Sequence, residues 1–246
     1  MMQFLEKILI LNRRKQAARR LGFNFQRAAG FILPAEILVD SRTARLNLPG
    51  DGGTKTAFVD VLMDDCYRLR TFPKTTRTVL DIGAHAGLFS IAGRLAFPNA
   101  KIHAYEPNPQ MLPFLSNQAE TAHFSFFGEA VGLAEGRISL DSGADSVHTR
   151  THRTEQGEIH CTSFASAVAR LGGAVDLVKL DCEGAEWEIL KDEKTWKDVS
   201  NLTMEFHLWA GYTIEELKAR IVQLGFEVRH CNLCGKDFGL LQAIRK

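Results

Sequence analysis

From Arg77 onward, strand-like and helix-like segments alternate regularly, and this alternation constrains the fold more than any other feature of the chain. Apolar, β-branched runs predict seven strands, at 78–82, 101–105, 124–131, 177–180, 202–206, 226–230 and 240–244. Helical periodicity predicts helices at 88–96, 110–119, 185–191 and 214–224. The pattern predicts an α/β, doubly wound, Rossmann-like sheet of seven mostly parallel strands. No helix separates the last two strands, so the C-terminal strand is expected to run antiparallel.

The residues before this alternation predict a separate N-terminal extension, 1–73, packed on a core domain, 74–246. The extension is expected to hold a helix at 2–22, a β-hairpin from 36–40 and 44–48, and a helix at 58–70. Within the core, the polar stretch 132–162 interrupts the alternation and contains two short strands, 137–140 and 158–161. We expect it to lie over one sheet edge and to contribute to specificity, as loops often do.

The first thirty residues are strongly basic, although the whole chain carries a formal net charge of only +1. Phe4, Ile8, Leu11 and Ala18 form one apolar stripe of the first predicted helix, which we expect to pack on the domain. The alternative is a surface for an acidic partner, an anionic substrate or membrane headgroups. The apolar run is too short to span a membrane and has no cleavage site, so the sequence predicts a cytoplasmic protein. A homodimer is compatible with this sequence.

Five scattered cysteines, an odd number, argue against a disulfide framework and for a reducing compartment. Cys231 and Cys234 form a lone C-x-x-C with His230 beside it. A zinc site requires more ligands at similar spacing, so no metal is predicted there.

The segment 79–90 reads as a buried strand that runs through Asp81-x-Gly83-x-x-x-Gly87 into a helix. Gly83 allows a sharp turn beside a ligand, and Gly87 allows the helix to pack close to the strand. The G-x-G-x-x-G spacing that a dinucleotide pyrophosphate requires is missing, because His85 stands where a glycine would be. A ligand without phosphates fits better, and Asp81 could hold its cationic amine; S-adenosylmethionine has these properties.

Two further cofactor-binding signals follow, at the ends of the second and third strands. Glu106, followed by Pro107, is placed to accept the ribose hydroxyls. Glu129, Ala130 and Val131 are expected beside the adenine ring. These three signals lie at the ends of three successive strands, and together they predict that the chain binds S-adenosylmethionine.

The fourth and fifth strands end in ionisable residues, which are expected on the same rim. Lys179-Leu-Asp-Cys-Glu-Gly-Ala-Glu186 ends the fourth strand, and Met204-Glu-Phe-His207 ends the fifth. Strand alternation places Lys179 on the same side as Asp181, and Glu205 on the same side as His207.

These motifs, D-x-G-A-x-x-G, K-L-D-C-E-G-A-E and E-F-H, resemble those of FkbM-type methyltransferases over about residues 64–243, including Asp65-Cys-Tyr-Arg-Leu69. The resemblance implies a class I enzyme that O-methylates a sugar, glycoconjugate or secondary metabolite, with N-methylation of a peptide or amide as the minority alternative. It implies that Asp81, Gly83, Gly87 and Glu106 bind S-adenosylmethionine. It also implies that Asp181, Glu183 and Glu186 line or brace the site, and that Glu205 and His207 face a small-molecule or glycan acceptor. His85 and Asp181 are also expected to bind the cofactor. The chain departs from the family pattern at His85, where Asn is usual, and at Thr162-Ser-Phe164, where Leu-Asp is common.

The expected chemistry is in-line methyl transfer with a base to take the acceptor's proton. His207 is the first choice as base and Asp181 the second, with Glu205 beside them. A divalent cation held by these three side chains is an alternative, and so is a cofactor-binding scaffold without catalysis. Glu183 and Glu186 also suit a helix start irrespective of function. Neither Pro-Pro-aromatic nor Pro-Cys follows the fourth strand, which argues against a DNA methyltransferase.

Overall fold

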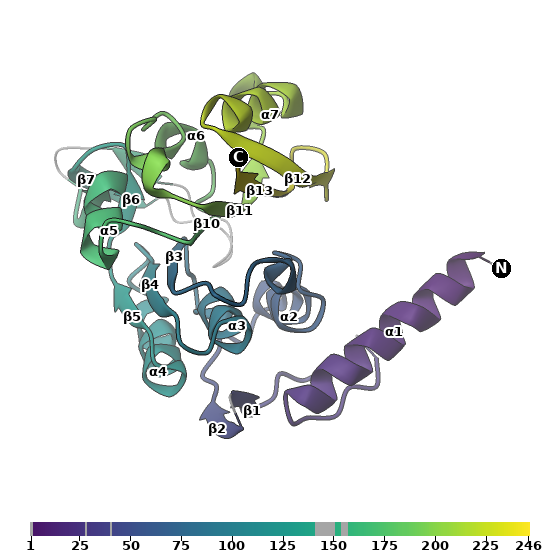
Figure 1. Ribbon diagram of the computed structural model, residues 1–246. Helices are drawn as coiled ribbons and strands as arrows, with labels where there is room; N and C mark the ends of the chain where they lie inside the picture. The colour runs from purple at the N-terminus through teal and green to yellow at the C-terminus, as the bar shows by residue number, and fades with distance from the viewer. Residues whose placement is uncertain (1, 28, 40, 141–150, 154–156) are drawn as a thin grey trace.

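The computed structural model describes residues 2–27, 29–39, 41–140, 151–153 and 157–246. A seven-stranded sheet forms its centre, in the order β12-β13-β11-β10-β3-β4-β5 (Figure 1). Five neighbouring strands run parallel: β5 (Ser125–Phe127), β4 (Lys101–Tyr105), β3 (Thr78–Ile82), β10 (Leu177–Leu180) and β11 (Asn201–His207). This is the predicted α/β, doubly wound, Rossmann-like fold.

The C-terminal hairpin completes the sheet in the expected antiparallel manner. β12 (Phe226–Leu233) pairs antiparallel with β13 (Phe238–Arg245), and β13 inserts between β12 and β11. β13 is therefore the one antiparallel strand of the central sheet.

Helices cover both faces because alternate side chains of each strand point to opposite faces. Val79 of β3 packs in the cluster with α3 (Leu88–Ala96) and α4 (Leu112–Ala122). Leu80 of the same strand packs in the other cluster, with α5 (Phe164–Leu171) and α7 (Ile214–Gln223). A short helix, α6 (Glu186–Ile189), and a 3₁₀ turn, η3 (Thr195–Asp198), connect β10 to β11.

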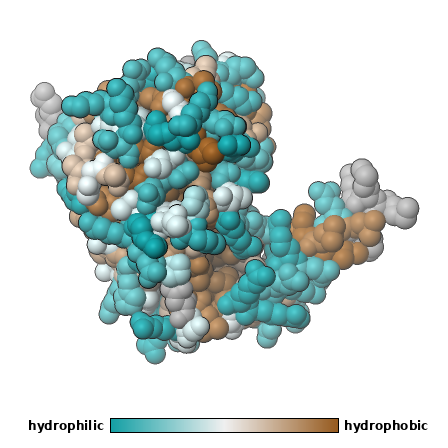
Figure 2. Space-filling view, in the orientation of Figure 1, coloured by the Kyte–Doolittle hydropathy of each residue, from teal (hydrophilic) through white to brown (hydrophobic). Residues whose placement is uncertain are grey.

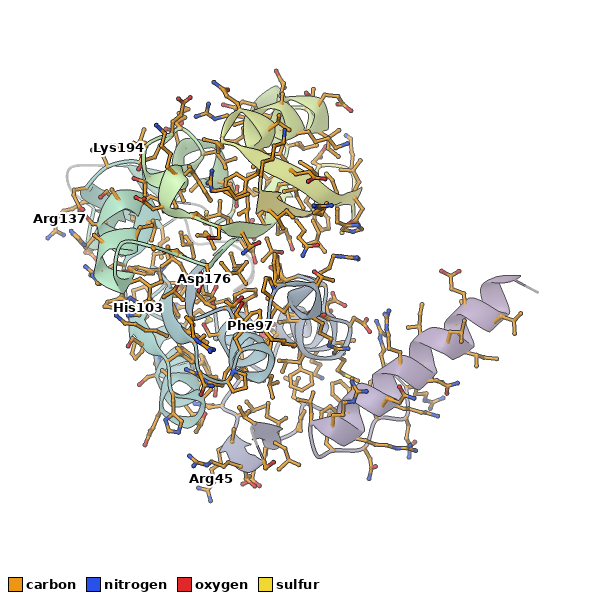
Figure 3. The ribbon with its side chains drawn as sticks, viewed as in Figure 1. Arg45, Phe97, His103, Arg137, Asp176 and Lys194 are labelled. Carbon is orange, nitrogen blue, oxygen red and sulfur yellow. The ribbon has the colours of Figure 1, made fainter. Side chains whose placement is uncertain are left out.

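Hydrogen bonds join the N-terminal ends of β3 and β10, at the edge of the sheet opposite the carboxyl ends of the strands. The Asp176 carboxylate accepts the backbone N–H groups of Arg77 and Thr78, at 2.6 and 3.0 Å (Figure 3). Because Asp176 immediately precedes β10, these bonds hold β10 and β3 in register.

The bounds predicted for the helix at 58–70 are wrong. The helical segment begins earlier, as α2 (Gly52–Phe58), and continues as a π-helical turn, η1 (Val59–Met63). Asp51 caps α2 by accepting the Thr54 N–H at 2.7 Å, a capping signal that the prediction missed. Asp65 then adopts a left-handed conformation and accepts the Leu69 N–H, which turns the chain into η2 (Leu69–Thr71).

The predicted third strand, 124–131, is two strands of different sheets. β5 ends at Phe127, and after Gly128 the chain enters β6 (Ala130–Gly132) of a second sheet, ordered β6-β9-β7-β8. The side chain of Leu112 packs against Gly128 and would have to shift to admit a Cβ there. The second sheet contains the two strands expected in the insertion, as β7 (Gly136–Leu140) and β9 (Ile159–Ser163), with β8 (Thr151–Arg153) beside β7. The rest of the insertion, 141–150 and 154–156, lies outside the described residues.

Helix α5 follows β9 directly and was not predicted. Ser163 caps it, and Phe164, Ala167, Val168 and Leu171 form its buried face. This i, i+3, i+4, i+7 spacing is the helical signal that the analysis of the sequence passed over.

The N-terminal extension consists of α1 (Met2–Arg20), a small sheet of β1 (Glu36–Val39) and β2 (Arg42–Arg45), and the α2–η1 helical segment. The last turns of α1 pack on the body through Ala17 and Ala18, whereas its first turns project away from it (Figure 1). The expectation that the apolar stripe packs on the domain is therefore wrong for Ile8, which is exposed. The side chain of Phe4 lies outside the described residues. Within the described part of the chain, no helix is long and apolar enough to cross a membrane. The domain boundary at residue 73 stays a prediction.

Candidate active site

A cavity of about 460 Å³ opens at the carboxyl ends of β3, β4, β10 and β11. In open α/β sheets, ligands bind at this edge, where the strand order reverses; here the reversal lies between β3 and β10. The cavity has two halves. One lies along the β3–α3 turn and the end of β4, and the other lies between α2–η1 and the β12–β13 hairpin.

The β3–α3 turn forms the floor of the first half. Gly83 has a φ of 79°, and a Cβ built on it would lie 1.7 Å from the backbone oxygen of Asp181. Any side chain at this position would therefore separate β3 from the loop after β10. Gly87 does not line the cavity; it begins α3 in a left-handed conformation and lies close to Leu115, so the close approach it permits is to α4 and not, as expected, to the strand.

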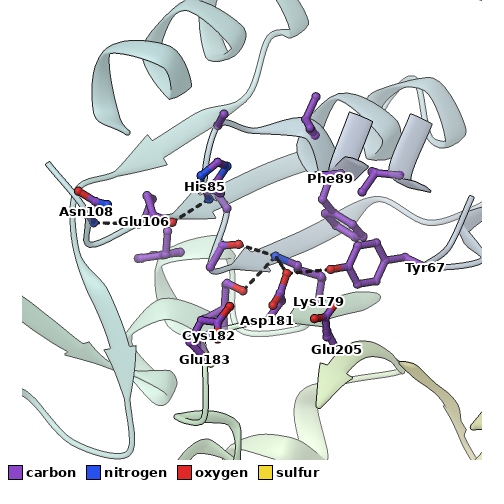
Figure 4. A pocket seen from close by; sticks show the side chains of 18 of the residues that line it. Tyr67, His85, Phe89, Glu106, Asn108, Lys179, Asp181, Cys182, Glu183 and Glu205 are labelled. Atoms are coloured by element: carbon purple, nitrogen blue, oxygen red, sulfur yellow. Dashed lines mark hydrogen bonds and ion pairs between the residues drawn. The ribbon is translucent and has the colours of Figure 1, made fainter. Parts of the chain in front are cut away.

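Glu106 lies where the sequence predicts the ribose acceptor, at the end of β4 and on the cavity wall. Its two carboxylate oxygens accept the backbone N–H groups of His85 and Asn108, at 2.7 and 2.8 Å (Figure 4). Burial raises the pKa of Glu106 to about 7, although these two bonds oppose the shift. The carboxyl group is thereby fixed in one orientation beside the turn.

Pro107, Ala130 and Val131 also line this half, as expected for the adenine side. Glu129 lines it too, but its carboxylate forms an ion pair with Arg170 at 3.1 Å. The adjoining wall is aromatic, because Tyr105 stacks on Phe127 with ring centroids 4.8 Å apart.

Asp81 does not reach the cavity. Its side chain is fully buried, accepts the Ser90 hydroxyl at 2.7 Å and lies 3.3 Å from the Lys179 ammonium. The expectation that Asp81 contacts the cofactor amine directly thus finds no support, because a protein cation already occupies the position beside it. Burial raises the pKa of Asp81, and Lys179 counteracts the shift.

Lys179 connects the two predicted acids. Its Nζ lies 3.5 Å from Asp181 (Figure 4) and 3.3 Å from Asp81. It also donates hydrogen bonds to the carbonyl oxygens of Ile82 and Gly83. Burial alone lowers the pKa of Lys179, but the two carboxylates outweigh it and hold the pKa above its usual value. The ammonium therefore remains charged and ties the ends of β3 and β10 together.

Tyr67, within the Asp65–Leu69 motif, is a site residue whose role the sequence did not indicate. Its buried hydroxyl donates to Asp181 at 2.8 Å, and its ring packs edge-on against Phe89 (Figure 4). Burial and the nearby carboxylate of Asp181 raise the pKa of Tyr67 well above its usual value, so it stays a hydrogen-bond donor. Asp181 is thus oriented by both Tyr67 and Lys179.

Glu205, at the end of β11, lines the cavity next to Asp181, as the sequence predicts (Figure 4). Its side chain is 30% exposed. Burial, followed by repulsion from Asp181, raises its pKa to about 8.

His207 is buried behind the rim and is not among the residues that line the cavity. Its Nδ1 lies 3.5 Å from Glu186, and its Nε2 lies 3.6 Å from Glu183 and 3.7 Å from Glu205. Burial alone lowers the pKa of His207, but Glu186 and the other acids raise it to about 9. An imidazolium cannot accept a proton, so this placement argues against the expected role of His207 as the base.

Glu183 and Glu186 both follow β10, but they serve the loop after it differently. Glu186 accepts the backbone N–H groups of Cys182 and Gly184, at 2.8 and 2.9 Å, and begins α6. Glu183 lines the cavity and adopts a left-handed conformation with a φ of 54°. Glu186 thus braces this loop and Glu183 lines the cavity, while their roles toward cofactor and acceptor stay predictions.

The second half of the cavity has walls that the sequence did not reveal. Thr56, Ala57 and Asp60 come from α2–η1, and Phe238 and Leu240 come from β13. The described residues of the 132–162 insertion, which we expected here, do not line the cavity. Cys234 lines it, but Cys231 does not, and both thiols are free. In the ranges that the structure describes, no cluster of three His, Cys, Asp or Glu side chains is arranged to hold a metal ion.

Comparison with known proteins assigns the chain to a family. The family model for the methyltransferase FkbM domain matches residues 81–232. This match covers more than half of the chain. The chain belongs to the FkbM methyltransferase family. This assignment agrees with the resemblance of its motifs.

Two methyltransferases are similar over most of their length. Methyltransferase sdnD of Sordaria araneosa is 25% identical, over 70% of this FkbM-family chain and 81% of its own length. Methyltransferase 1 of Beauveria bassiana is 23% identical, over 59% of this chain and 70% of its own. Among solved structures, a candidate S-adenosylmethionine-dependent methyltransferase from Streptococcus mutans has a TM-score of 0.50 at 10% identity, covering 87% of this chain and 56% of that one. This last similarity concerns the fold alone.

Proposed function

We propose that this FkbM-family chain transfers a methyl group from S-adenosylmethionine to a hydroxyl group of a sugar, glycoconjugate or secondary metabolite. Membership in the family supports methyl transfer. The observation that carries the proposal is one continuous cavity that runs from the carboxyl group of Glu106 to those of Asp181 and Glu205. Such a cavity can hold a cofactor at one end and an acceptor at the other.

The residues of the first half fit S-adenosylmethionine. The volume is within the range of about 300–1,000 Å³ that is usual for cofactor sites, and Gly83 lines it where the turn meets the backbone of Asp181 closely. Glu106 would accept the ribose hydroxyls, and Ala130 and Val131 would contact the adenine. When bound, S-adenosylmethionine supplies an electrophilic methyl group on a sulfonium. Asp181 would face its methionine end, oriented by Tyr67 and Lys179.

Glu205 is the best-placed base among the three predicted catalytic residues. It lines the cavity, whereas His207 lies behind it and carries a positive charge up to about pH 9. The carboxylate of Asp181 already accepts a hydrogen bond from the Tyr67 hydroxyl and forms an ion pair with Lys179, so it is less available than Glu205 to accept a proton. Glu205 accepts the proton of the acceptor hydroxyl, and His207 positions Glu205 from behind.

The charges around the second half indicate which acceptors fit. Asp60, Asp181 and Glu205 line it, and the one cation among the described lining residues, Lys179, is paired with two carboxylates. An uncharged hydroxyl compound fits this surface, and a phosphorylated acceptor is repelled by it. The same acids attract a protonated amine, which makes an N-methyltransferase the second candidate.

The test is methyl transfer from radiolabelled S-adenosylmethionine to a panel of neutral glycosides, with matched amino and phosphorylated analogues. We expect labelled product from a neutral hydroxylated acceptor and none from its phosphorylated analogue. Preference for the amino analogue would move the assignment to N-methylation. Cofactor binding without transfer to any acceptor would favour the scaffold alternative.

A further inference from the structure

The first three turns of α1 form an arm that projects from the molecule with apolar side chains in solvent. Leu5, Ile8 and Leu9 are 56%, 39% and 68% exposed. Figure 2 shows this apolar patch on the projecting helix, apart from the body. Leaving such side chains in water is unfavourable, and contiguous exposed apolar patches mark interaction sites.

The base of the arm is firmly attached. The Arg14 guanidinium donates hydrogen bonds from two of its nitrogens to the Asp64 carboxylate, and Arg13 donates a further one at 3.2 Å. Ala17 and Ala18 are buried against the body. The exposed turns are therefore held at a defined angle to the body.

The charge of the arm complements an anionic surface. With seven basic residues against one acid, the first thirty residues carry +6, whereas the whole chain carries +1. At 3.6 residues per turn, Lys15, Arg19 and Arg20 continue on the side of the helix that begins with Leu5, Ile8 and Leu9. Among the described residues, no carboxylate forms a salt bridge with these three cations.

We propose that α1 docks this chain on an anionic lipid membrane, with Leu5, Ile8 and Leu9 inserted among the acyl chains and the basic residues over the headgroups. Burial of apolar side chains and attraction of cations to anionic lipids both strengthen binding at a membrane interface. The proposal does not depend on the proposed methyl transfer.

A second copy of the chain fits the arm less well. The other large exposed apolar side chains that the structure describes, such as Ile32, Val222 and Leu233, lie on separate elements. A second recess, lined by Ala17, Leu21 and Leu69, lies beneath the base of α1 itself. Charged residues, among them Asp65 and Arg70, also line this recess, so it is not a purely apolar groove for the arm.

The test is co-sedimentation of the full chain with vesicles of phosphatidylcholine alone or with about one third phosphatidylserine. We expect binding to the anionic vesicles that weakens with added salt, and little binding to the neutral ones. L5Q/L9Q should reduce it by about a hundredfold, at about tenfold for each buried leucine. R19Q/R20Q should reduce it by about tenfold or more. I32Q/V222Q, which changes exposed apolar residues elsewhere, is the matched control and should bind as the native chain does.

Thermal unfolding should be unchanged in L5Q/L9Q, because both side chains lie in solvent. Equal binding to the two kinds of vesicle, or full binding by L5Q/L9Q, would overturn the proposal. Failure of the native chain to bind, together with a dimer that L5Q/L9Q converts to monomers, would assign the arm to contacts between copies instead.

Discussion

Replacing Glu205 by glutamine tests the proposed chemistry, because it removes the ionisable group and keeps the size of the side chain. General base catalysis contributes about 10²- to 10⁴-fold to a rate, and we expect kcat to fall by that factor in Glu205→Gln. Cofactor affinity should change less than about twofold, since the Glu106 half of the cavity is untouched.

The pH profile gives an independent readout. Burial and Asp181 raise the pKa of Glu205 to about 8, and only the carboxylate accepts a proton. The activity of the native chain should therefore rise with pH through about 8, and this rise should disappear in Glu205→Gln.

His207→Gln is the companion variant, because His207 acts on Glu205 from 3.7 Å. Coulomb's law at an effective dielectric constant of about 20 gives an attraction of about 4 kcal/mol, or about three pKa units as an upper bound. Solvent at the partly exposed rim reduces this value, so we expect the activity profile to move up by about one pH unit.

The assay is the initial rate of S-adenosylhomocysteine release with the best acceptor of the panel, at saturating substrates and from pH 6 to about 10. Near-native turnover in Glu205→Gln would refute Glu205 as the base. A profile in His207→Gln that loses its rise altogether would return the base to His207.

Three further outcomes follow from the same contacts. Glu106→Gln should weaken cofactor binding by about 1–3 kcal/mol, because two ribose hydroxyls lose a charged acceptor; calorimetry that finds native affinity would show that Glu106 does not hold the ribose. Lys179→Met should destabilise the fold by about 3–5 kcal/mol, because Asp81 is then buried without a counter-charge; urea unfolding with a native midpoint would contradict this assignment. EDTA should leave activity unchanged, and restoration of a lost activity by Mg²⁺ or Mn²⁺ would instead support metal assistance.

The sheet and the cofactor turn were predictable because their signals are local. Apolar runs mark the buried strands, and the spacing of Gly83 and Gly87 marks the turn. The position of Glu106 at the end of a predicted strand was enough to predict its carboxylate at the ligand-binding edge of the sheet. The split of 124–131 did have a local signal that the prediction missed, because Gly128, Glu129 and Ala130 are residue types depleted in strands.

The acceptor side could not be predicted, because its residues are distant in sequence. Asp60 and Tyr67 precede the sheet, yet they line the same cavity as Asp181, and Tyr67 donates a hydrogen bond to its carboxylate. The charge of His207 likewise depends on Glu183 and Glu186, which only the fold brings beside it. The sequence identified these ionisable residues as a group, but their separate roles follow from burial and from which atoms they contact.

Calorimetric titration of the native chain and of Gly83→Val with S-adenosylmethionine tests the central claim most directly. The account predicts micromolar binding to the native chain, no binding of NAD, and loss of binding in Gly83→Val, because a side chain at Gly83 collides with the backbone of Asp181. Far-ultraviolet circular dichroism confirms that the variant is folded before it is titrated. A native chain that binds NAD instead of S-adenosylmethionine, or a folded Gly83→Val that binds S-adenosylmethionine as tightly as the native chain, would contradict the account.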